Sequence, residues 1–164
     1  MTVPRYTIVP SPIDELLLIS DGRALTGLFM APHTIDPRRE RRDDDPVLTE
    51  AAAQLDAFFA GDRLDFDLAL DPAGTPFQRR VWSELRRIAY GETISYGELA
   101  RRVGRPGAAR AVGLANGRNP ISVIVPCHRV IGADGSLTGY GGGIPRKRYL
   151  LDHEARLIGG RLPL

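Results

Sequence analysis

One cysteine supplies the most reactive side chain of this sequence. Cys127 is the only cysteine among 164 residues, and His128 and Arg129 follow it directly. A thiol becomes a strong nucleophile when a neighbouring imidazole and cationic groups lower its pKa. A lone cysteine can equally be a small buried hydrophobic residue, and consecutive side chains on an extended strand point to opposite faces. The residue types therefore permit thiolate chemistry at Cys127 without requiring it.

A carboxylate further along the chain could complete such a site. The apolar spacing after Pro145 predicts a helix. Its apolar face holds Leu150, Leu151, Leu157 and Ile158. Glu154 falls on the same face, where an unpaired charge is costly. Glu154 therefore either forms a salt bridge with an arginine or orients His128, which would then activate Cys127. We expect the neighbouring His153 to lie at the surface.

The charges are distributed unevenly along the chain. Residues 1–75 hold 7 arginines and 14 acidic residues, a net charge of −7, whereas residues 76–164 hold 15 basic and 6 acidic residues, a net charge of +9. Almost all of the positive charge is arginine, which suits bidentate contacts to phosphates or bases. A solvated basic surface would have the same composition. The asymmetry nevertheless favours a nucleic-acid-binding C-terminal half.

The composition also bears on compartment and cofactors. No run approaches the roughly 20 apolar residues of a membrane span, and residues 1–5 lack the apolar core of a signal peptide. We expect a cytoplasmic protein that does not bind membranes. His33, His128 and His153 have no metal-ligand spacing, and a single cysteine excludes a multi-cysteine zinc site. We therefore expect neither a metal nor another cofactor.

The first half of the chain has the pattern of a small α+β unit. Strands are predicted at 6–9, 16–19 and 24–30, with Asp21-Gly22 as the hairpin turn between the last two. Residues 31–46 are rich in charge and show no apolar periodicity. This pattern predicts a solvated, mobile loop.

A helix, an edge strand and a linker are predicted to follow. The helix spans 47–60 and ends at Gly61. Its buried face would hold Leu48, Ala52, Leu55 and Phe59. Apolar residues and aspartates alternate over 64–70, the period-two pattern of a half-buried edge strand. The sequence Asp-Pro-Ala-Gly at 71–74 is typical of a domain linker.

The second half is mostly helical before the cysteine. Thr75 and Gln78 form a capping signature for one helix, and Ser95 and Glu98 begin a shorter second helix in the same way. A third helix is predicted at 107–116, after a turn that contains glycine and proline. Two short helices across a tight turn have helix-turn-helix dimensions. The apolar stripe of the first helix would be Phe77, Val81, Leu85 and Ile88.

The third helix is made almost entirely of small residues. Arg110 is its only charged side chain. Gly113 in its interior costs roughly 1 kcal/mol relative to alanine, so something must approach it closely. Tight packing between helices would explain the glycine, and so would close approach to a nucleic-acid backbone.

Ordered motifs give the sequence a specific family resemblance. They are GETISYGELA at 91–100, AARAVG at 108–113, NP at 119–120, VPCHRV at 125–130 and GYGG at 139–142. In this order and spacing they resemble the O6-alkylguanine-DNA alkyltransferases. The resemblance implies a two-domain α+β protein. Residues 1–73 would form a ribonuclease-H-like α/β domain, and residues 74–164 a helical catalytic domain similar to a winged helix-turn-helix.

The resemblance assigns the chemistry to individual residues. Cys127 is similar to the alkyl acceptor, His128 to the base that takes its proton through a bound water, and Glu154 to the carboxylate that orients the histidine. A bridging water overcomes the strained geometry of adjacent residues. Asn119 resembles the residue that holds the turn before the reactive segment. Tyr96 resembles the phenol that donates to the guanine as O6 becomes a leaving group.

The resemblance also assigns the contacts to DNA. Tyr140 would form a wall of the base pocket, and the carbonyls of Cys127 and Val130 would read the guanine amino group. Well-studied relatives have a serine at Gly141, so here only a backbone N–H can meet the guanine oxygen. Arg110 would fill the gap left by the flipped nucleotide. The minor groove would be entered by the small residues Ala109, Ala111 and Gly113.

Three functions are compatible with these residues. The resemblance implies DNA repair, in which the alkyl group of O6-alkylguanine in double-stranded DNA passes irreversibly to Cys127 in a single turnover. A damage-sensing binding module of the same fold would lack the cysteine. A thiol hydrolase would need an oxyanion hole, and no separate motif for one is present. The resemblance further implies a bacterial-type monomer without structural zinc, and it leaves cooperative assembly on DNA open.

Overall fold

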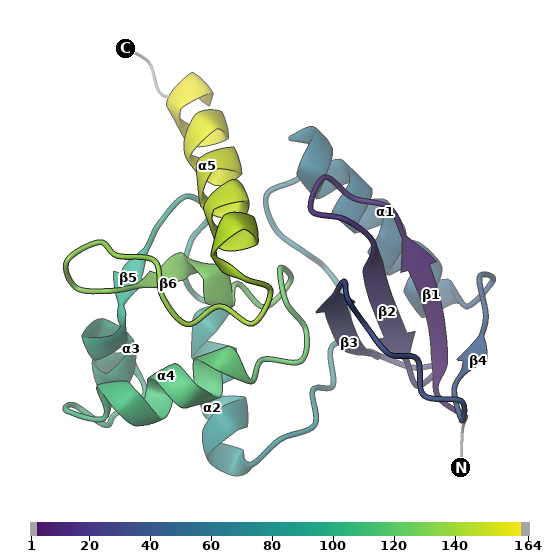
Figure 1. The fold of residues 1–164 in the computed structure, drawn as a ribbon, viewed down its shortest axis with the longest axis horizontal. Coiled ribbons are helices and arrows are strands. Elements are labelled where there is room, and N and C mark those ends of the chain that lie inside the picture. The colour runs from purple at the N-terminus through teal and green to yellow at the C-terminus, as the bar shows by residue number, and fades with distance from the viewer. Residues whose placement is uncertain (1–2, 162–164) are drawn as a thin grey trace. The chain divides into compact units, whose positions relative to one another are not determined.

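The protein is described by a computed structural model that covers residues 3–161 (Figure 1). Within this range the chain divides into two compact units. The first runs to Ala73 and includes Pro120–Ser122, and the second comprises Gly74–Asn119 and the chain from Val123 onward. A short stretch of the later sequence therefore belongs to the first unit.

The first unit contains a four-stranded sheet. Its strands are β1 (Arg5–Val9), β2 (Leu16–Ser20), β3 (Leu25–Met30) and β4 (Glu40–Arg41). The order is β3-β2-β1-β4, with β2 antiparallel to both β1 and β3, and β4 parallel to β1. The hairpin turn before β3 forms as predicted, because Asp21 Oδ1 accepts hydrogen bonds from the N–H groups of Arg23 and Ala24 at 2.8 and 2.9 Å. The three predicted strands are confirmed.

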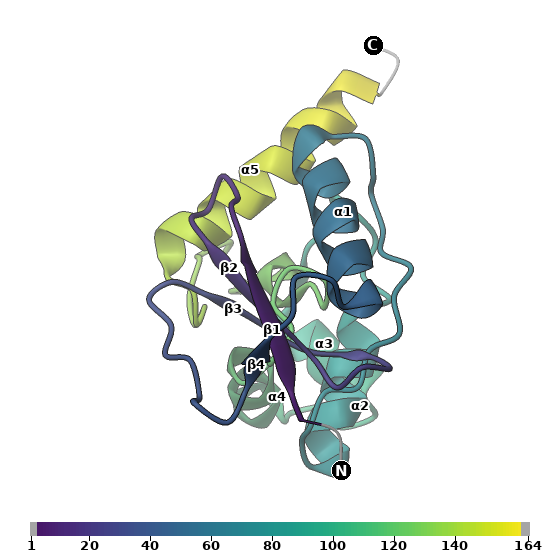
Figure 2. The same cartoon turned by 90° about the vertical axis from the view of Figure 1, so that its right-hand side faces the viewer.

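Helix α1 (Pro46–Ala60) packs on this sheet, as Figure 2 shows. Asp45 caps its first turn by accepting from the N–H groups of Val47 and Leu48. Gly61 ends the helix in the left-handed region, with φ 86°. The predicted helix and its glycine stop are confirmed.

The buried face of α1 is turned relative to the prediction. Ala52 and Phe59, which we expected in the core, are half-buried. The predicted and the observed sets of buried residues both have helical spacing. The spacing alone therefore could not show which of two adjacent residues is buried. The fully buried ring of Phe58 packs 5.3 Å from that of Phe66. The buried residues are Leu48, Ala51, Gln54, Leu55 and Phe58.

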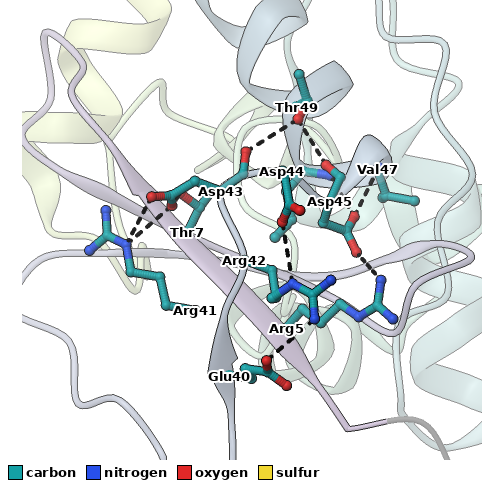
Figure 3. A network of polar contacts seen from close by, with 11 residues as sticks. Arg5, Thr7, Glu40, Arg41, Arg42, Asp43, Asp44, Asp45, Val47 and Thr49 are labelled. Atoms are coloured by element: carbon teal, nitrogen blue, oxygen red, sulfur yellow. Dashed lines mark hydrogen bonds and ion pairs between the residues drawn. The ribbon is translucent and has the colours of Figure 1, made fainter.

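The predicted solvated loop at 31–46 is wrong where β4 forms. β4 pairs with β1 in parallel register, with Arg5 opposite Glu40. The charges that indicated solvation form a network with one another and with β1 (Figure 3). Thr7 Oγ1 donates to Asp43 at 2.7 Å, and Arg5 Nη1 donates to Asp45 at 2.9 Å. Ion pairs and hydrogen bonds between basic and acidic residues can therefore order a segment that has no apolar pattern.

The predicted edge strand at 64–70 is also wrong. Only Leu70 makes a β-bridge, to Leu25. The alternation itself is present, with the leucine and phenylalanine side chains half-buried and the aspartates exposed. The side-chain amide of Gln54 takes the place of a neighbouring strand, because it donates to the carbonyl of Asp67 and accepts from its N–H, both at 2.9 Å.

Residues Pro120–Ser122 lie along β3. The N–H of Leu28 donates to the carbonyl of Pro120 at 2.8 Å, and its carbonyl accepts from the N–H of Ser122 at 3.3 Å. These bonds form a parallel bridge between Leu28 and Ile121. Backbone pairing with the sheet thus holds the segment that directly precedes Val123.

The second unit consists of helices around a small sheet. Its elements are α2 (Pro76–Leu85), β5 (Ile94–Ser95), α3 (Tyr96–Arg102), α4 (Ala109–Gly117), the 3₁₀ turn η1 (Cys127–Arg129), β6 (Val130–Ile131) and α5 (Ile144–Arg161). β5 and β6 pair in parallel. Helices α2, α3 and α4 contact one another. The predicted apolar stripe of α2 is buried, apart from the half-buried Phe77.

Helices α3 and α4 form the predicted helix-turn-helix. The side chain of Ser95 caps α3 by accepting from the N–H of Glu98 at 3.1 Å. α4 begins at Ala109 rather than at Gly107, because Gly107 has a left-handed φ of 87°. Trp82 Nε1 donates to the carbonyl of Ala115 at 2.8 Å and so ties α4 to α2.

Candidate active site

The segment that carries Cys127 is tightly constrained. Cys127 is 4% exposed and begins the turn η1, so it and His128 are not consecutive residues of a strand. Val123, a β-branched residue, has a left-handed φ of 72°, a strained conformation that occurs mainly at functional sites. Asn119 Nδ2 donates to the carbonyl of Val125 at 2.8 Å, and Asn116 Nδ2 donates to that of Cys127 at 3.3 Å. Through these bonds the two asparagine side chains hold the backbone at Val125 and Cys127.

His128 and Glu154 meet in the interior of the unit. His128 Nε2 lies 2.8 Å from Glu154 Oε2, and the two side chains are 0% and 1% exposed. They come from η1 and α5, elements that contact each other. His128 is therefore one of the two partners that the sequence left open for Glu154.

Glu154 has the second partner as well. Arg129 donates to both carboxylate oxygens, from Nε to Oε1 and from Nη2 to Oε2, each at 2.9 Å. Its Nη1 donates to the carbonyl of Ile88 at 2.7 Å, and the N–H of Gly91 reaches Oε1 at 3.2 Å. The sequence had placed Arg129 beside the thiol as a cation. Instead, the guanidinium group of Arg129 pairs with Glu154. The only sequence signal for this role is the position of Arg129 next to His128.

These contacts determine the charge states of the pair. Burial raises the pKa of Glu154, but the bonds from His128 and Arg129 outweigh it, and the pKa falls to about 2. Burial lowers the pKa of His128 against the pull of Glu154. At neutral pH the site therefore holds a carboxylate and a neutral imidazole. Because a carboxylate only accepts hydrogen bonds, Nε2 carries the imidazole proton and Nδ1 offers a lone pair.

The second ring nitrogen of His128, Nδ1, takes no part in the hydrogen bonds that link Arg129, Glu154 and His128 Nε2. It is buried and has no hydrogen-bond partner among the described protein atoms. Buried polar atoms are rarely left in this state unless a water or a reacting group serves them. This arrangement would suit a general base, because Glu154 orients the ring through Nε2 and leaves Nδ1 to accept a proton.

Tyr96 and Lys147 hold the loop that precedes α5. The Tyr96 hydroxyl donates to the carbonyl of Thr138 at 3.0 Å, and Lys147 Nζ donates to the same carbonyl at 2.9 Å. Lys147 also donates to the carbonyl of Val130 at 2.6 Å. Burial lowers the pKa of this fully enclosed lysine. The sequence analysis missed Lys147, although it is the only lysine of the chain and lies in the first turn of α5.

Tyr140 lies in the same loop. Its side chain is buried, and its hydroxyl has no hydrogen-bond partner within the described residues. Burial raises the pKa of Tyr140 well above its ordinary value, so the phenol stays protonated. Gly141 is exposed beside the end of α4, where a Cβ would lie 3.7 Å from the carbonyl oxygen of Gly117. The loop therefore presents a protonated phenol and a bare backbone.

Only some of the α4 residues that we predicted to contact DNA lie on the exposed face of the helix. Arg110 and Ala111 are exposed, whereas Ala109 and Gly113 are half-buried. A Cβ on Gly113 would lie 3.6 Å from the ring of Tyr96, an ordinary contact distance. Gly113 thus faces Tyr96 of α3, but this contact leaves room for a Cβ, so packing between the helices does not by itself require the glycine.

His153 does not lie at the surface as predicted. It is 4% exposed, and its ring stacks on that of Tyr149 with centroids 6.1 Å apart. The prediction assumed that α5 is buried only along its apolar face, which excludes His153. The structure also buries the side of α5 that carries His153.

Between residues 3 and 161, no group of three or more histidine, cysteine, aspartate and glutamate side chains is placed to hold a metal ion. No helix in the same range is both long and apolar enough to cross a lipid bilayer.

Comparison with known families identifies the class. The model of the DNA binding domain of 6-O-methylguanine DNA methyltransferase matches residues 76–156, and that of its ribonuclease-like domain matches residues 5–72. A ribonuclease-like unit followed by a helix-turn-helix unit with a buried cysteine defines the two-domain DNA alkyltransferases. The chain belongs to the 6-O-methylguanine DNA methyltransferase family. The resemblance found in the sequence and the expected α+β fold are confirmed.

Individual relatives cover nearly the whole chain. It is 57% identical to the methylated-DNA–protein-cysteine methyltransferase of Mycobacterium tuberculosis over 151 residues, and this aligned region covers 92% of each chain. The relative of the same name from Methanosarcina acetivorans is 48% identical over 151 residues, 91% of this chain and 97% of its own. The crystal structure of M. tuberculosis OGT in complex with DNA matches with a TM-score of 0.87 at 54% identity, over 93% of this chain and 94% of that one.

Proposed function

We propose that this protein repairs O6-alkylguanine in double-stranded DNA by transferring the alkyl group to Cys127. The pairing of His128 Nε2 with Glu154 at 2.8 Å carries the proposal, because it leaves a buried basic nitrogen for the proton of the adjacent thiol. Cys127 is also the only thiol in the chain that could accept the group. Membership of the methyltransferase family supports the same reaction.

The transfer makes one bond and breaks one. The thiol proton of Cys127 passes through a water to His128 Nδ1, and the sulfur attacks the alkyl carbon in line with its bond to O6. The sulfur–carbon bond forms as the carbon–oxygen bond breaks, and the electron pair remains on the guanine. The Tyr96 hydroxyl donates a hydrogen bond to the departing guanine. Overall, Cys127 loses one proton and the guanine gains one, so His128 and Tyr96 end in their original protonation states. The products are unmodified guanine and a thioether.

The residues around the thiol would hold a flipped guanine. Tyr140 supplies a wall and a hydroxyl that has no partner within the described residues. The carbonyl of Val130 and the N–H of Gly141 would read the base edge. The Tyr96 hydroxyl now binds the carbonyl of Thr138 at 3.0 Å, so it has to exchange this partner for the guanine.

Helix α4 would deliver the base to this pocket. An alkyl group on a stacked base cannot be reached for in-line attack, so the nucleotide has to leave the duplex. Arg110 is exposed on α4 and would occupy the space left in the stack. Small neighbours such as Ala111 let the helix approach the minor groove, which is only about 6 Å wide.

Stoichiometry tests the proposed reaction. A thioether has no leaving group that water displaces easily, so one protein should repair one lesion. Mixing the protein with excess O6-methylguanine oligonucleotide should add one methyl group to its intact mass and yield repaired DNA equal in amount to protein. Repeated turnover, as a thiol hydrolase would show, would contradict the proposal.

The role of Arg110 gives a second test. Arg110→Ala should slow repair of a duplex roughly tenfold or more, because nothing then replaces the extruded base. Its reaction with free O6-benzylguanine should keep the wild-type rate. Arg156→Ala, at an exposed arginine of α5, is the matched control and should alter neither rate. An equal loss on duplex and free base would assign Arg110 to the fold instead.

The setting of this reaction is also proposed. A protein that depends on a free thiol suits the reducing cytoplasm. We propose that it acts there as a monomer on damaged double-stranded DNA, without a cofactor, because the transferred group and its acceptor are the only reactants.

A further inference from the structure

The exposed face of α4 carries a large apolar side chain that the proposed reaction does not use. Leu114 is 64% exposed, the largest exposed fraction among the large hydrophobic residues of the described chain. The others, Val3, Phe29 and Ile144, are 49%, 39% and 38% exposed. A single exposed leucine is ordinary on a protein surface, so its position must decide whether it has a function.

Leu114 lies at the centre of a defined stripe. With 3.6 residues per turn, the positions that share its face are those three to four residues away. The exposed residues of α4 and its C-cap are Arg110, Ala111, Leu114, Gly117 and Arg118, and the buried ones are Val112, Ala115 and Asn116. Leu114 therefore stands between two exposed arginines, with only small residues beside it.

The surroundings of Leu114 indicate the chemistry of its partner. An arginine one turn before and another one turn after suit DNA, because guanidinium groups pair with phosphates and stack on aromatic rings. A leucine between them suits apolar surface that lies beside the phosphates. The walls of a DNA minor groove provide this combination, since the C–H groups of deoxyribose lie between the phosphate rows. Proteins that bind this groove often insert apolar side chains into it.

We propose that Leu114 is a DNA-contacting residue that packs against the minor-groove wall of the damaged duplex, one turn from Arg110. This inference rests on the proposed function, which places α4 on DNA. Arg110 would enter the base stack, Arg118 would pair with a phosphate, and Leu114 would keep the groove open between them. Its contribution is apolar and should therefore not depend on salt.

Binding of full-length protein to duplex DNA containing O6-methylguanine tests the proposal, with Cys127→Ala present throughout to prevent reaction. Leu114→Ala should weaken binding roughly tenfold, the order expected when most of a leucine side chain loses its buried contact. Leu114→Gln should bind no better than Leu114→Ala, and Leu114→Met should restore binding to within about twofold of the leucine. Val3→Ala, at an exposed apolar residue of the first unit, should bind like the parent.

Salt dependence separates an apolar contact from an ionic one. The slope of log affinity against log salt concentration should be unchanged in Leu114→Ala. In Arg118→Gln it should fall by about 1, as for one lost phosphate contact. A reduced slope in Leu114→Ala would overturn the proposal, because the loss would then be electrostatic.

The remaining outcomes separate this inference from the proposed function. In the chain that retains Cys127, Leu114→Ala should keep the wild-type melting temperature and rate with free O6-benzylguanine. A loss of either would mean that Leu114 supports the fold, and the inference would be wrong. If Leu114→Ala and Leu114→Gln bind normally while Arg110→Ala and Arg118→Gln are impaired, only the inference fails. If all four variants bind normally, α4 does not face DNA.

Discussion

Replacing Cys127 with alanine should abolish alkyl transfer while damaged DNA remains bound. No other thiol exists in the chain, so no second acceptor can take the methyl group. Intact mass after mixing with an O6-methylguanine duplex should show no added methyl, and affinity for that duplex should stay within about twofold of the wild type. The substitution removes one sulfur from a buried turn and should cost only about 1 kcal/mol of stability.

Cys127→Ser is the matched control for this result. A serine hydroxyl occupies nearly the same space but is a weak nucleophile at its ordinary pKa, so transfer should again be undetectable. Both variants should retain the wild-type fold by circular dichroism. A methylated Cys127→Ala protein would show that the acceptor has been assigned wrongly.

The sequence was sufficient for features that depend on local chemistry. Gly61 ends α1, and Ser95 caps α3, because caps and stops use short-range hydrogen bonds and backbone geometry that residue type reveals. Glu154 was expected to need a partner because it shares a face with leucines. The structure shows two partners, His128 and Arg129, and the apolar periodicity of α5 is what indicated that Glu154 needs one.

The sequence was insufficient where a distant group satisfies the backbone. Residues 64–70 have the alternation of a strand, yet Gln54 of α1 binds Asp67 in place of a neighbouring strand. β4 forms in a charged segment because the carbonyls of Pro4 and Tyr6 accept hydrogen bonds from the N–H groups of Glu40 and Arg42. The role of Arg129 was missed for the same reason, since the position of Glu154 next to it is set by α5.

The largest effect on stability is expected from breaking the pair of Arg129 and Glu154. Arg129→Met should lower the free energy of unfolding by about 3–5 kcal/mol, because it leaves a buried carboxylate without its permanent cation. Urea unfolding measures this loss. Arg87→Met, which removes an exposed arginine 3.8 Å from Glu84, should change stability by no more than about 1 kcal/mol. A loss in Arg129→Met as small as this control would mean that the buried pair contributes little.

Acid unfolding shows whether Arg129 acts through the charge of Glu154. In the wild type the pKa of Glu154 is about 2, below its ordinary value of 4.5. Ionised Glu154 therefore contributes stability that is fully present above about pH 4.5 and is lost as the pH falls towards 2. Arg129→Met removes one of the groups that lower this pKa, while burial still raises it. The acid-induced loss of stability should then begin at a higher pH, and transfer to Cys127 from free O6-benzylguanine should slow as Glu154 becomes protonated and His128 loses its anionic partner. If Arg129→Met lowered stability equally at every pH, Arg129 would act through packing alone.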